Sequence, residues 1–373
     1  MRKVILSMII GLFLALPCYA TDTIISDIGS DPGDDYSTLA AWWTAKAGNL
    51  VTADQIQIAE CRGELHARGT DAVITMTSGT ATTDATHYYV IRPMTGAYFR
   101  GDFDNVASVA RFTSTNSIAL TIDISYTRVY GILVSGNSGG GVRREFYAAS
   151  ATNLLLDGVG IYNCSASGLN LSHTMAAIEF GSSNTYQIRN CAINNMYSNA
   201  TGTTSGKTVK SYGFFGTTSS ASGLIYNTTI TNIIADNDDS GSDCHASAWG
   251  IFGCPTVTNT LAMLTVATAA NGTPTAADFS TITTQSYNAS EDTTSDGTGS
   301  IDSVTPTDEI TDTSTTTCDV HLKTGADCLL AATDLSASFT TDIDGDTRDA
   351  GYWDIGADQK STAPAPTGYG QVI

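Results

Sequence analysis

A short motif, in which an apolar residue stands two places before an asparagine, recurs through the middle of this chain. It occurs in residues 160–164, 187–191 and 224–228, and Thr258-Asn259-Thr260 carries a further asparagine. Counted along the sequence, the intervals between these asparagines are 27, 37 and 32 residues. Self-similarity at intervals of about 20 to 50 residues is typical of solenoids, in which each repeat is one structural unit that stacks on the next.

A second echo is interleaved with the first. Residues 178–181, 213–216 and 250–253 each place a large apolar residue before a glycine, at spacings of 35 and 37 residues. Around both echoes the chain alternates between short β-like runs and clusters of Gly, Ser, Thr, Asn and Asp. The runs are residues 56–58, 88–91, 118–124, 129–134 and 154–156.

These patterns predict an all-β protein. No segment between Val51 and Phe279 has sustained helical periodicity, which argues against a fold of alternating strands and helices. We therefore expect a single-stranded, right-handed parallel β-helix with about 30 residues per coil. Asparagines at the same turn of successive coils would hydrogen-bond through their side-chain amides, forming a ladder.

The two ends of the chain indicate export and capping. Residues 1–20 combine basic residues, an apolar run and a small-residue cleavage site near Ala20, which predicts a secretory signal and an extracellular or periplasmic protein. No later run is apolar enough to predict a membrane span. Residues 21–50 are expected to cap the solenoid with a short helix over residues 34–43. An alternative role for Trp42 and Trp43 is sugar stacking.

The remaining boundaries follow from composition. We expect the β-helix over residues 51–290, its C-terminal end and cap over 291–359, and a flexible tail over 360–373.

Seven cysteines follow the predicted signal, in a compartment where disulfides persist. Cys244 with Cys254, and Cys318 with Cys328, are each ten residues apart and could close short loops. Cys164 and Cys191 follow asparagines of the repeat, so stacked copies would bring them within disulfide distance, although an unpaired stack of buried thiols is the alternative. Cys61 has no predicted partner.

The charge of the chain constrains its partners. The formal net charge is −20, from 37 acidic and 17 basic residues, which argues against nucleic acid or an anionic membrane as a partner. It also counts mildly against an anionic polysaccharide, unless cations bridge the two.

The repeat resembles the right-handed parallel β-helix proteins of the pectate-lyase-like superfamily. A secreted subset of them resembles this chain at both ends, through residues 35–42, and through Asp342-Ile343-Asp344-Gly345 with Arg348, followed by residues 354–357. That subset usually has glutamate where this chain has Asp358-Gln359. The resemblance implies the fold and assigns no catalytic residue.

The segment from residue 342 to 349 alternates carboxylates around a glycine, as the first half of a calcium loop does. It makes Asp342, Asp344 and Asp346 candidate metal ligands and calcium a possible cofactor. A full loop would end on glutamate, where this chain has Trp353. The alternative is structural, with Arg348 paired to one of these aspartates or to Asp354 and holding the terminal segment over the last coil. The five histidines are scattered and show no metal spacing.

An acidic loop over residues 236–245 is the second place with possible chemistry. Glycoside hydrolysis needs two carboxylates, which Asp238, Asp239 and Asp243 could supply, although we favour a solvated loop as the explanation of these residues. A lyase would instead need a base and a cation near a uronate, for which Arg189 is the candidate.

Taken together, the sequence predicts an exported β-helix protein that binds a polysaccharide or cell-surface glycan, or that serves as a surface or adhesion module. Abundant Ser, Thr and Asn offer hydrogen-bond partners for sugars, and Tyr and Trp offer stacking faces. The alternative is a polysaccharide lyase or glycoside hydrolase that acts on the same face. The chain is expected to be a monomer, or a trimer if it resembles a phage fibre.

Overall fold

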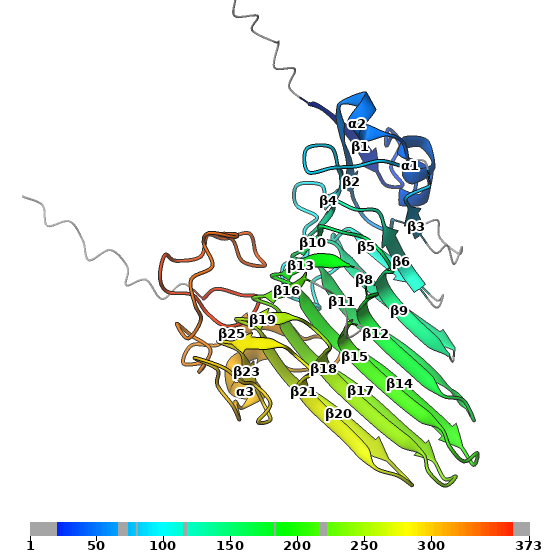
Figure 1. Cartoon of the computed structure of the whole chain (residues 1–373), viewed down its shortest axis with the longest axis vertical. Helices are drawn as coiled ribbons and strands as arrows, with labels where there is room; N and C mark the ends of the chain where they lie inside the picture. The colour runs from blue at the N-terminus through cyan, green and yellow to red at the C-terminus, as the bar shows by residue number, and fades with distance from the viewer. Residues whose placement is uncertain are drawn as a thin grey trace, which may run out of the picture.

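The chain folds into a right-handed parallel β-helix, as the repeat predicts (Figure 1). The computed structural model describes residues 21–65, 74–79, 81–114, 118–139, 141–182, 184–216 and 222–360. The predicted signal and nearly all of the predicted tail lie outside these residues.

Three parallel sheets form the walls of the helix, and from Tyr89 onward the chain visits them in the same order in each coil. Sheet 1 has nine strands, which are β1 (Asp22–Ile28), β2 (Gln55–Cys61), β4 (Tyr89–Pro93), β7 (Thr127–Tyr130), β10 (Leu154–Asp157), β13 (Thr185–Arg189), β16 (Ser222–Tyr226), β19 (Thr256–Thr258) and β22 (Thr284–Ser286).

Sheets 2 and 3 have seven strands each and contain the longest strands of the molecule. Sheet 2 consists of β5 (Arg111–Ser114), β8 (Leu133–Gly139), β11 (Gly160–Leu169), β14 (Ala192–Gly202), β17 (Thr229–Asp239), β20 (Leu261–Ala269) and β23 (Ala289–Ser290). Sheet 3 consists of β3 (Ile74–Thr77), β6 (Ile118–Asp123), β9 (Val142–Ala148), β12 (His173–Phe180), β15 (Thr208–Gly216), β18 (His245–Phe252) and β21 (Pro274–Ser280).

The core is a column of side chains that repeat from coil to coil. Phe146, Phe180 and Phe214 point inward from successive strands of sheet 3 and pack edge to face, with ring centroids 6.2 and 5.8 Å apart. Each buried phenylalanine contributes about 1.5–3 kcal/mol relative to an exposed one. The second sequence echo is thus the inward face of sheet 3, because Phe214 lies opposite both Ile178 and Ile251.

The turn from sheet 1 to sheet 2 explains three of the repeated asparagines. Asn190, Asn227 and Asn259 are fully buried there, with φ values of 51°, 42° and 57°. Asparagine is the residue other than glycine that best tolerates this left-handed conformation, and glycine occupies the turn in the earlier coils, at Gly131 and Gly158. Asn259 Nδ2 donates to Asn227 Oδ1 at 3.2 Å, which is one rung of the expected ladder.

The structure places Asn163 in a different ladder from the one that the sequence suggested. Asn163 lies inside β11, where it forms a bulge, and its Oδ1 accepts a hydrogen bond from Asn195 Nδ2 at 3.2 Å. The equivalent position in β17 is Asn232, again with positive φ. Asn163 and Asn195 are separated by a full coil of 32 residues, whereas the interval of 27 residues to Asn190 links a strand bulge to a turn.

Two helices cover the N-terminal end. Helix α1 (Leu39–Lys46) begins at the N-cap Thr38, and α2 (Leu50–Ala53) follows directly. Trp42 is completely buried and packs edge-on against Tyr89 of sheet 1, with ring centroids 6.0 Å apart. Trp42 therefore serves the core and is not exposed for sugar stacking.

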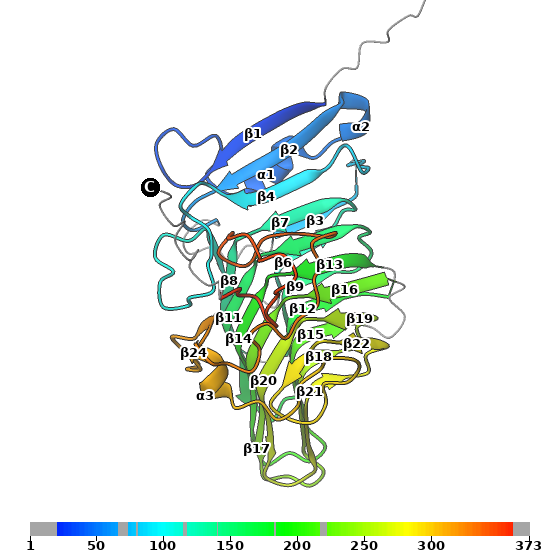
Figure 2. The same cartoon turned by 90° about the vertical axis from the view of Figure 1, so that its left-hand side faces the viewer.

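The C-terminal segment, residues 291–360, folds back along the side of the β-helix (Figure 2). It contains α3 (Pro306–Glu309) and the antiparallel pair β24 (Ile310–Asp312) and β25 (Asp319–Leu322). We call this segment the strap. Its backbone is bound by asparagine side chains of three coils, since Asn194 Nδ2 donates to Thr315 O, Asn227 Nδ2 to Asp354 O and Asn259 Nδ2 to Thr333 O at 3.1, 3.0 and 2.8 Å. The asparagines of the β-helix therefore hold the strap as well as one another.

The predicted disulfides are not formed. All seven cysteines of the described residues are buried and free. Cys164 lies in β11 opposite Gly136 and Met196 of the adjacent coils, whereas Cys191 lies in the turn before β14. The predicted link between them assumed that Asn163 and Asn190 share a turn, which they do not. Cys244 and Cys254 bracket the whole of β18, so they lie at opposite ends of a strand.

None of the helices in the described residues is long and apolar enough to cross a membrane.

Candidate functional site

Two acidic residues of the loop at 236–245 share a neighbour, because Asn199 Nδ2 lies 3.3 Å from Asp236 Oδ2 and 3.5 Å from Asp238 Oδ2. Asp239 is fully buried at the end of β17, where its Oδ1 accepts a hydrogen bond from Gly241 N at 2.9 Å. Asp238 is exposed and lies 3.5 Å from Asn199 Nδ2, and Asp243 is exposed in the turn before β18. Of the three predicted catalytic acids, Asp239 is therefore buried, and Asp238 is held beside Asp236 by Asn199.

Arg189 lies on a different wall from that loop. It points outward from β13 in sheet 1 and forms an ion pair with Asp157 at 2.9 Å. Its Nη1 donates to the strap carbonyl of Ser338 at 3.1 Å, and its guanidinium lies 5.1 Å from the ring centroid of Phe339. Arg189 thus attaches the strap to sheet 1 and is not brought together with Asp238, Asp239 or Asp243.

The outer face of sheet 1 carries a groove that sequence reasoning did not single out. Two hollows of about 390 and 470 Å³ adjoin at Arg128 and extend from β2 to β16. Because the strands are parallel and in register, outward side chains form rows along the axis of the β-helix, and one row lines the floor. That row consists of Ile58, Val90, Arg128, Leu155, Gln187 and Leu224.

Arg128 is the charged centre of this groove. Its guanidinium lies 3.8 Å from the ring centroid of Tyr88, a close cation–π contact. The neighbouring groove arginine, Arg92, is ion-paired with Glu60. Arg128 forms no ion pair with any described carboxylate, and no described Asp or Glu lines either hollow. The groove therefore offers a positive charge and aromatic faces without a facing pair of carboxylates.

A second aromatic surface lies on the outer face of sheet 3. The rings of Tyr212 and Trp249 stack with centroids 4.9 Å apart, and Phe215 stacks on Phe252 at 5.8 Å. Burial raises the pKa of Tyr212 to about 12. These rings cover one another on a flat sheet, so they make a patch rather than a groove.

The segment from Asp342 to Asp346 forms a tight turn organised by Asp342. The Oδ1 atom of Asp342 accepts hydrogen bonds from the backbone amides of Asp344 and Asp346, at 3.0 and 2.9 Å, and its Oδ2 accepts one from Gln359 N at 3.2 Å. Burial raises the pKa of Asp342 to about 6. Among the three aspartates proposed as calcium ligands, Asp342 is committed to the backbone of the turn and Asp346 is exposed.

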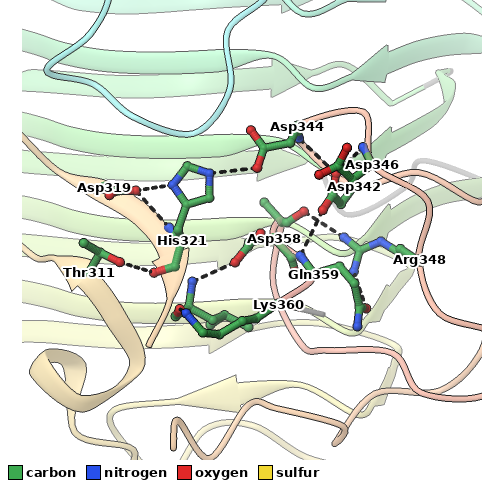
Figure 3. A network of polar contacts seen from close by, with 12 residues as sticks. Thr311, Asp319, His321, Asp342, Asp344, Asp346, Arg348, Asp358, Gln359 and Lys360 are labelled. Atoms are coloured by element: carbon green, nitrogen blue, oxygen red, sulfur yellow. Dashed lines mark hydrogen bonds and ion pairs between the residues drawn. The ribbon is translucent and has the colours of Figure 1, made fainter. Parts of the chain in front are cut away.

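Asp344 instead points to His321, which the sequence had shown as an isolated histidine (Figure 3). His321 Nε2 lies 3.0 Å from Asp344 Oδ2, and its Nδ1 contacts Asp319. Hydrogen bonds to Asp319 and Asp344 raise the pKa of His321 to about 11. Asp358, which directly follows residues 354–357, forms a group with His321 and Asp344 in which one ligand atom of each residue lies within 4.8 Å of the others.

Arg348 does not form the ion pair that the sequence suggested. It is buried, and its guanidinium donates to the carbonyls of Gly356 and Ala357 at 3.3 and 2.7 Å and to Asn190 Oδ1 at 3.1 Å. Its charge also lies 5.1 Å from the ring centroid of Trp353. Burial lowers the pKa of Arg348 to about 10. The role is structural, but it fixes the strap to the side of the coils and not over the last one.

Comparisons with known proteins identify no family for this chain. No protein-family model matches the chain, and no curated protein is significantly similar to it. One solved structure is similar, the pectate lyase Pel9A, with 9% sequence identity and a TM-score of 0.30, over 91% of this chain and 97% of that one.

Proposed function

We propose that this protein binds an extended carbohydrate chain in the groove on the outer face of sheet 1. The observation that carries the proposal is the stacked pair of Arg128 and Tyr88 at the junction of the two hollows. A sugar ring has apolar C–H faces that pack on aromatic rings, and its hydroxyl or carboxylate oxygens accept hydrogen bonds from a guanidinium.

The dimensions of the groove suit a polymer better than a small ligand. Five strand-to-strand intervals separate β2 from β16, which corresponds to about 24 Å at a spacing of ~4.8 Å. The row of outward side chains continues along this length, and Gln187 and Thr185 add amide and hydroxyl groups beyond Arg128. A linear glycan lying along the axis of the β-helix would contact this row of side chains over several coils.

Binding is favoured over hydrolysis because of where the acids lie. Glycoside hydrolysis needs two carboxylates on either side of the bond. The nearby carboxylates are engaged with other residues, since Glu60 is ion-paired with Arg92, and Asp157 is held by Arg189 and by Asn190 Nδ2 at 2.9 Å each. The acids and the arginine that the sequence suggested for a lyase or hydrolase therefore lie on separate walls of the β-helix.

Titration calorimetry against a panel of plant, algal and bacterial polysaccharides tests the proposal. We expect saturable binding that weakens about tenfold in both Tyr88→Ala and Arg128→Ala, since each removes a contact worth about 1 kcal/mol or more. The matched control is Tyr147→Ala, because Tyr147 also lies beside an arginine, Arg144, at 4.8 Å, but on sheet 3.

Three results would contradict the proposal. Loss of binding in Trp249→Ala with retention in Tyr88→Ala would move the site to the aromatic patch of sheet 3. Absence of binding to every polysaccharide in the panel would contradict carbohydrate binding as the function. Release of unsaturated products or reducing ends, abolished by Asp238→Ala or Arg189→Ala, would establish the enzyme instead.

A further inference from the structure

The strap contains a group of side chains with the composition of a metal centre. His321 belongs to β25, Asp344 to the tight turn after Asp342, and Asp358 to the segment that follows it. One ligand atom from each lies within 4.8 Å of the others, although the three residues are separated by 23 and 14 positions in the chain. An imidazole with two carboxylates is a ligand set suited to divalent transition metals such as zinc.

The surroundings of His321 are those of a ligand held by a second layer of groups. Asp319 contacts Nδ1, so that Nε2 faces Asp344 (Figure 3). Histidines that bind metals usually donate their other ring N–H to a carboxylate or carbonyl in this way, which fixes the tautomer and the ring orientation. The backbone carbonyl of His321 is itself fixed by Thr311 Oγ1 at 2.9 Å.

Asp358 is held in place from the opposite side of the group. Only 5% of this residue is exposed, and its Oδ2 accepts a hydrogen bond from Leu322 N at 2.8 Å. This bond from the backbone of β25 holds the carboxylate beside His321 and Asp344, with one ligand atom of each residue within 4.8 Å of the others.

His87 provides a comparison for the carboxylates around His321. His87 also contacts two aspartates, with Nδ1 2.8 Å from Asp84 and Nε2 3.0 Å from Asp54. Each of its nitrogens thus meets one carboxylate, on opposite sides of the ring. At His321, by contrast, Nε2 is grouped with two carboxylates, Asp344 and Asp358, so three ligands can surround one ion.

We propose that His321, Asp344 and Asp358 bind a divalent transition metal that clamps three segments of the strap together. Water would complete the coordination, since Asp344 also lines a cavity of about 140 Å³ between the strap and sheet 1. This site differs from the calcium loop that the sequence suggests, because it shares only Asp344 with it. It is independent of carbohydrate binding in the groove.

The test uses the whole protein after treatment with a chelator, titrated with zinc by calorimetry and melted with and without the ion. We expect one zinc ion per chain and a higher melting temperature when it is bound. His321→Gln and Asp344→Asn should weaken zinc binding by about 100-fold. His87→Gln and Asp346→Asn are matched controls and should bind zinc as the unmodified chain does.

Several outcomes would overturn the proposal. The proposal is wrong if the folded, unmodified chain binds no zinc. It is also wrong if Asp344→Asn binds zinc as tightly as the unmodified chain, or if His87→Gln no longer binds zinc. Calcium binding that needs Asp342 and Asp346, without zinc binding, would establish the calcium loop instead. If His321→Gln does not fold, as judged by circular dichroism, Asp344→Asn still decides, because Asp344 is a quarter exposed and its loss leaves no buried charge. The visible absorption of bound cobalt gives a second readout of the ligand set.

Discussion

Arg348 donates a hydrogen bond to the side-chain oxygen of Asn190 at 3.1 Å, joining two residues that lie 158 positions apart. Asn190 belongs to a turn of the β-helix, and Arg348 belongs to the strap. This bond, together with those to Gly356 O and Ala357 O, makes one buried guanidinium the link between the coils and the C-terminal segment. The strap is therefore part of the folded unit.

Replacing Arg348 should destabilise the protein by detaching the strap. Arg348→Ala leaves two carbonyls and an asparagine oxygen without their donor, so we expect a loss of about 2–4 kcal/mol in the free energy of unfolding by urea. Proteolysis should also become faster within residues 291–360. The exposed Arg100→Ala is the control, and an equal loss in both variants would contradict the linking role of Arg348.

Two substitutions of Asn259 should separate its backbone role from its bonds. Asn259→Ala loses the bonds to Asn227 and to both Thr333 N and Thr333 O, and it also places alanine at a φ of 57°. Asn259→Gly loses the same bonds but accepts that φ freely. Thermal melting should therefore show Asn259→Ala as less stable than Asn259→Gly by about 1 kcal/mol. Equal melting temperatures would mean that the left-handed turn imposes no strain.

Stability should fall as the pH rises from about 4 to about 7. Burial raises the pKa of Asp278 to about 7, with the nearby charge of Asp292 acting in the same direction, and burial likewise raises the pKa values of Asp342 and Asp354 to about 6. The folded state thus holds these protons more tightly than the unfolded state does. Their contribution is full below pH 4 and is lost as the pH passes each folded pKa.

The substitution Asp278→Asn measures how much Asp278 contributes to this pH dependence of stability. The amide stays neutral, so urea unfolding measured between pH 4 and pH 8 should show a flatter dependence, by a few kcal/mol at most. The exposed Asp308→Asn should leave the dependence as it is. An unchanged slope in Asp278→Asn would show that Asp278 is already ionised in the folded protein at low pH.

The cysteines should behave as buried thiols. Iodoacetamide added in denaturant without reductant should modify all seven cysteines of the described residues, and in the native protein it should modify them only slowly. A reductant should leave the melting temperature unchanged. Peptides that remain linked under non-reducing conditions would contradict the free state and restore the predicted pairs.

The repeat predicted the fold correctly, but it placed Asn163 and Asn190 in the same asparagine ladder, which is wrong. The motif shows that asparagine recurs at coil intervals, yet it looks the same at Asn163 and at Asn190. One lies in a strand bulge and the other in a turn, and both have positive φ. Since local conformation is alike at the two sites, only the pairing of whole strands tells them apart. The predicted disulfide between Cys164 and Cys191 was wrong for the same reason, because it assumed that the two asparagines share a turn.

The candidate sites depended still more on tertiary structure. Tyr88 and Arg128 come from different coils, and each is an ordinary outward residue in its own segment. His321 gave no signal because its partners lie 23 and 37 positions later, a spacing that no metal motif contains. The acidic run at 236–239 was conspicuous in the sequence, but its alternation along β17 sends Asp239 inward and leaves Asp238 exposed.

The sequence by itself determined the β-helix, the inward and outward alternation of its strands, and the need for left-handed turns at asparagine and glycine. These properties are local or periodic, so each coil carries its own copy of the information. Only the tertiary structure decided which asparagines share a ladder, where the strap lies, and which side chains meet at Arg128 and at His321. Those contacts depend on the lengths of the loops between strands, because the loops set how far each coil shifts the residues that finally lie side by side.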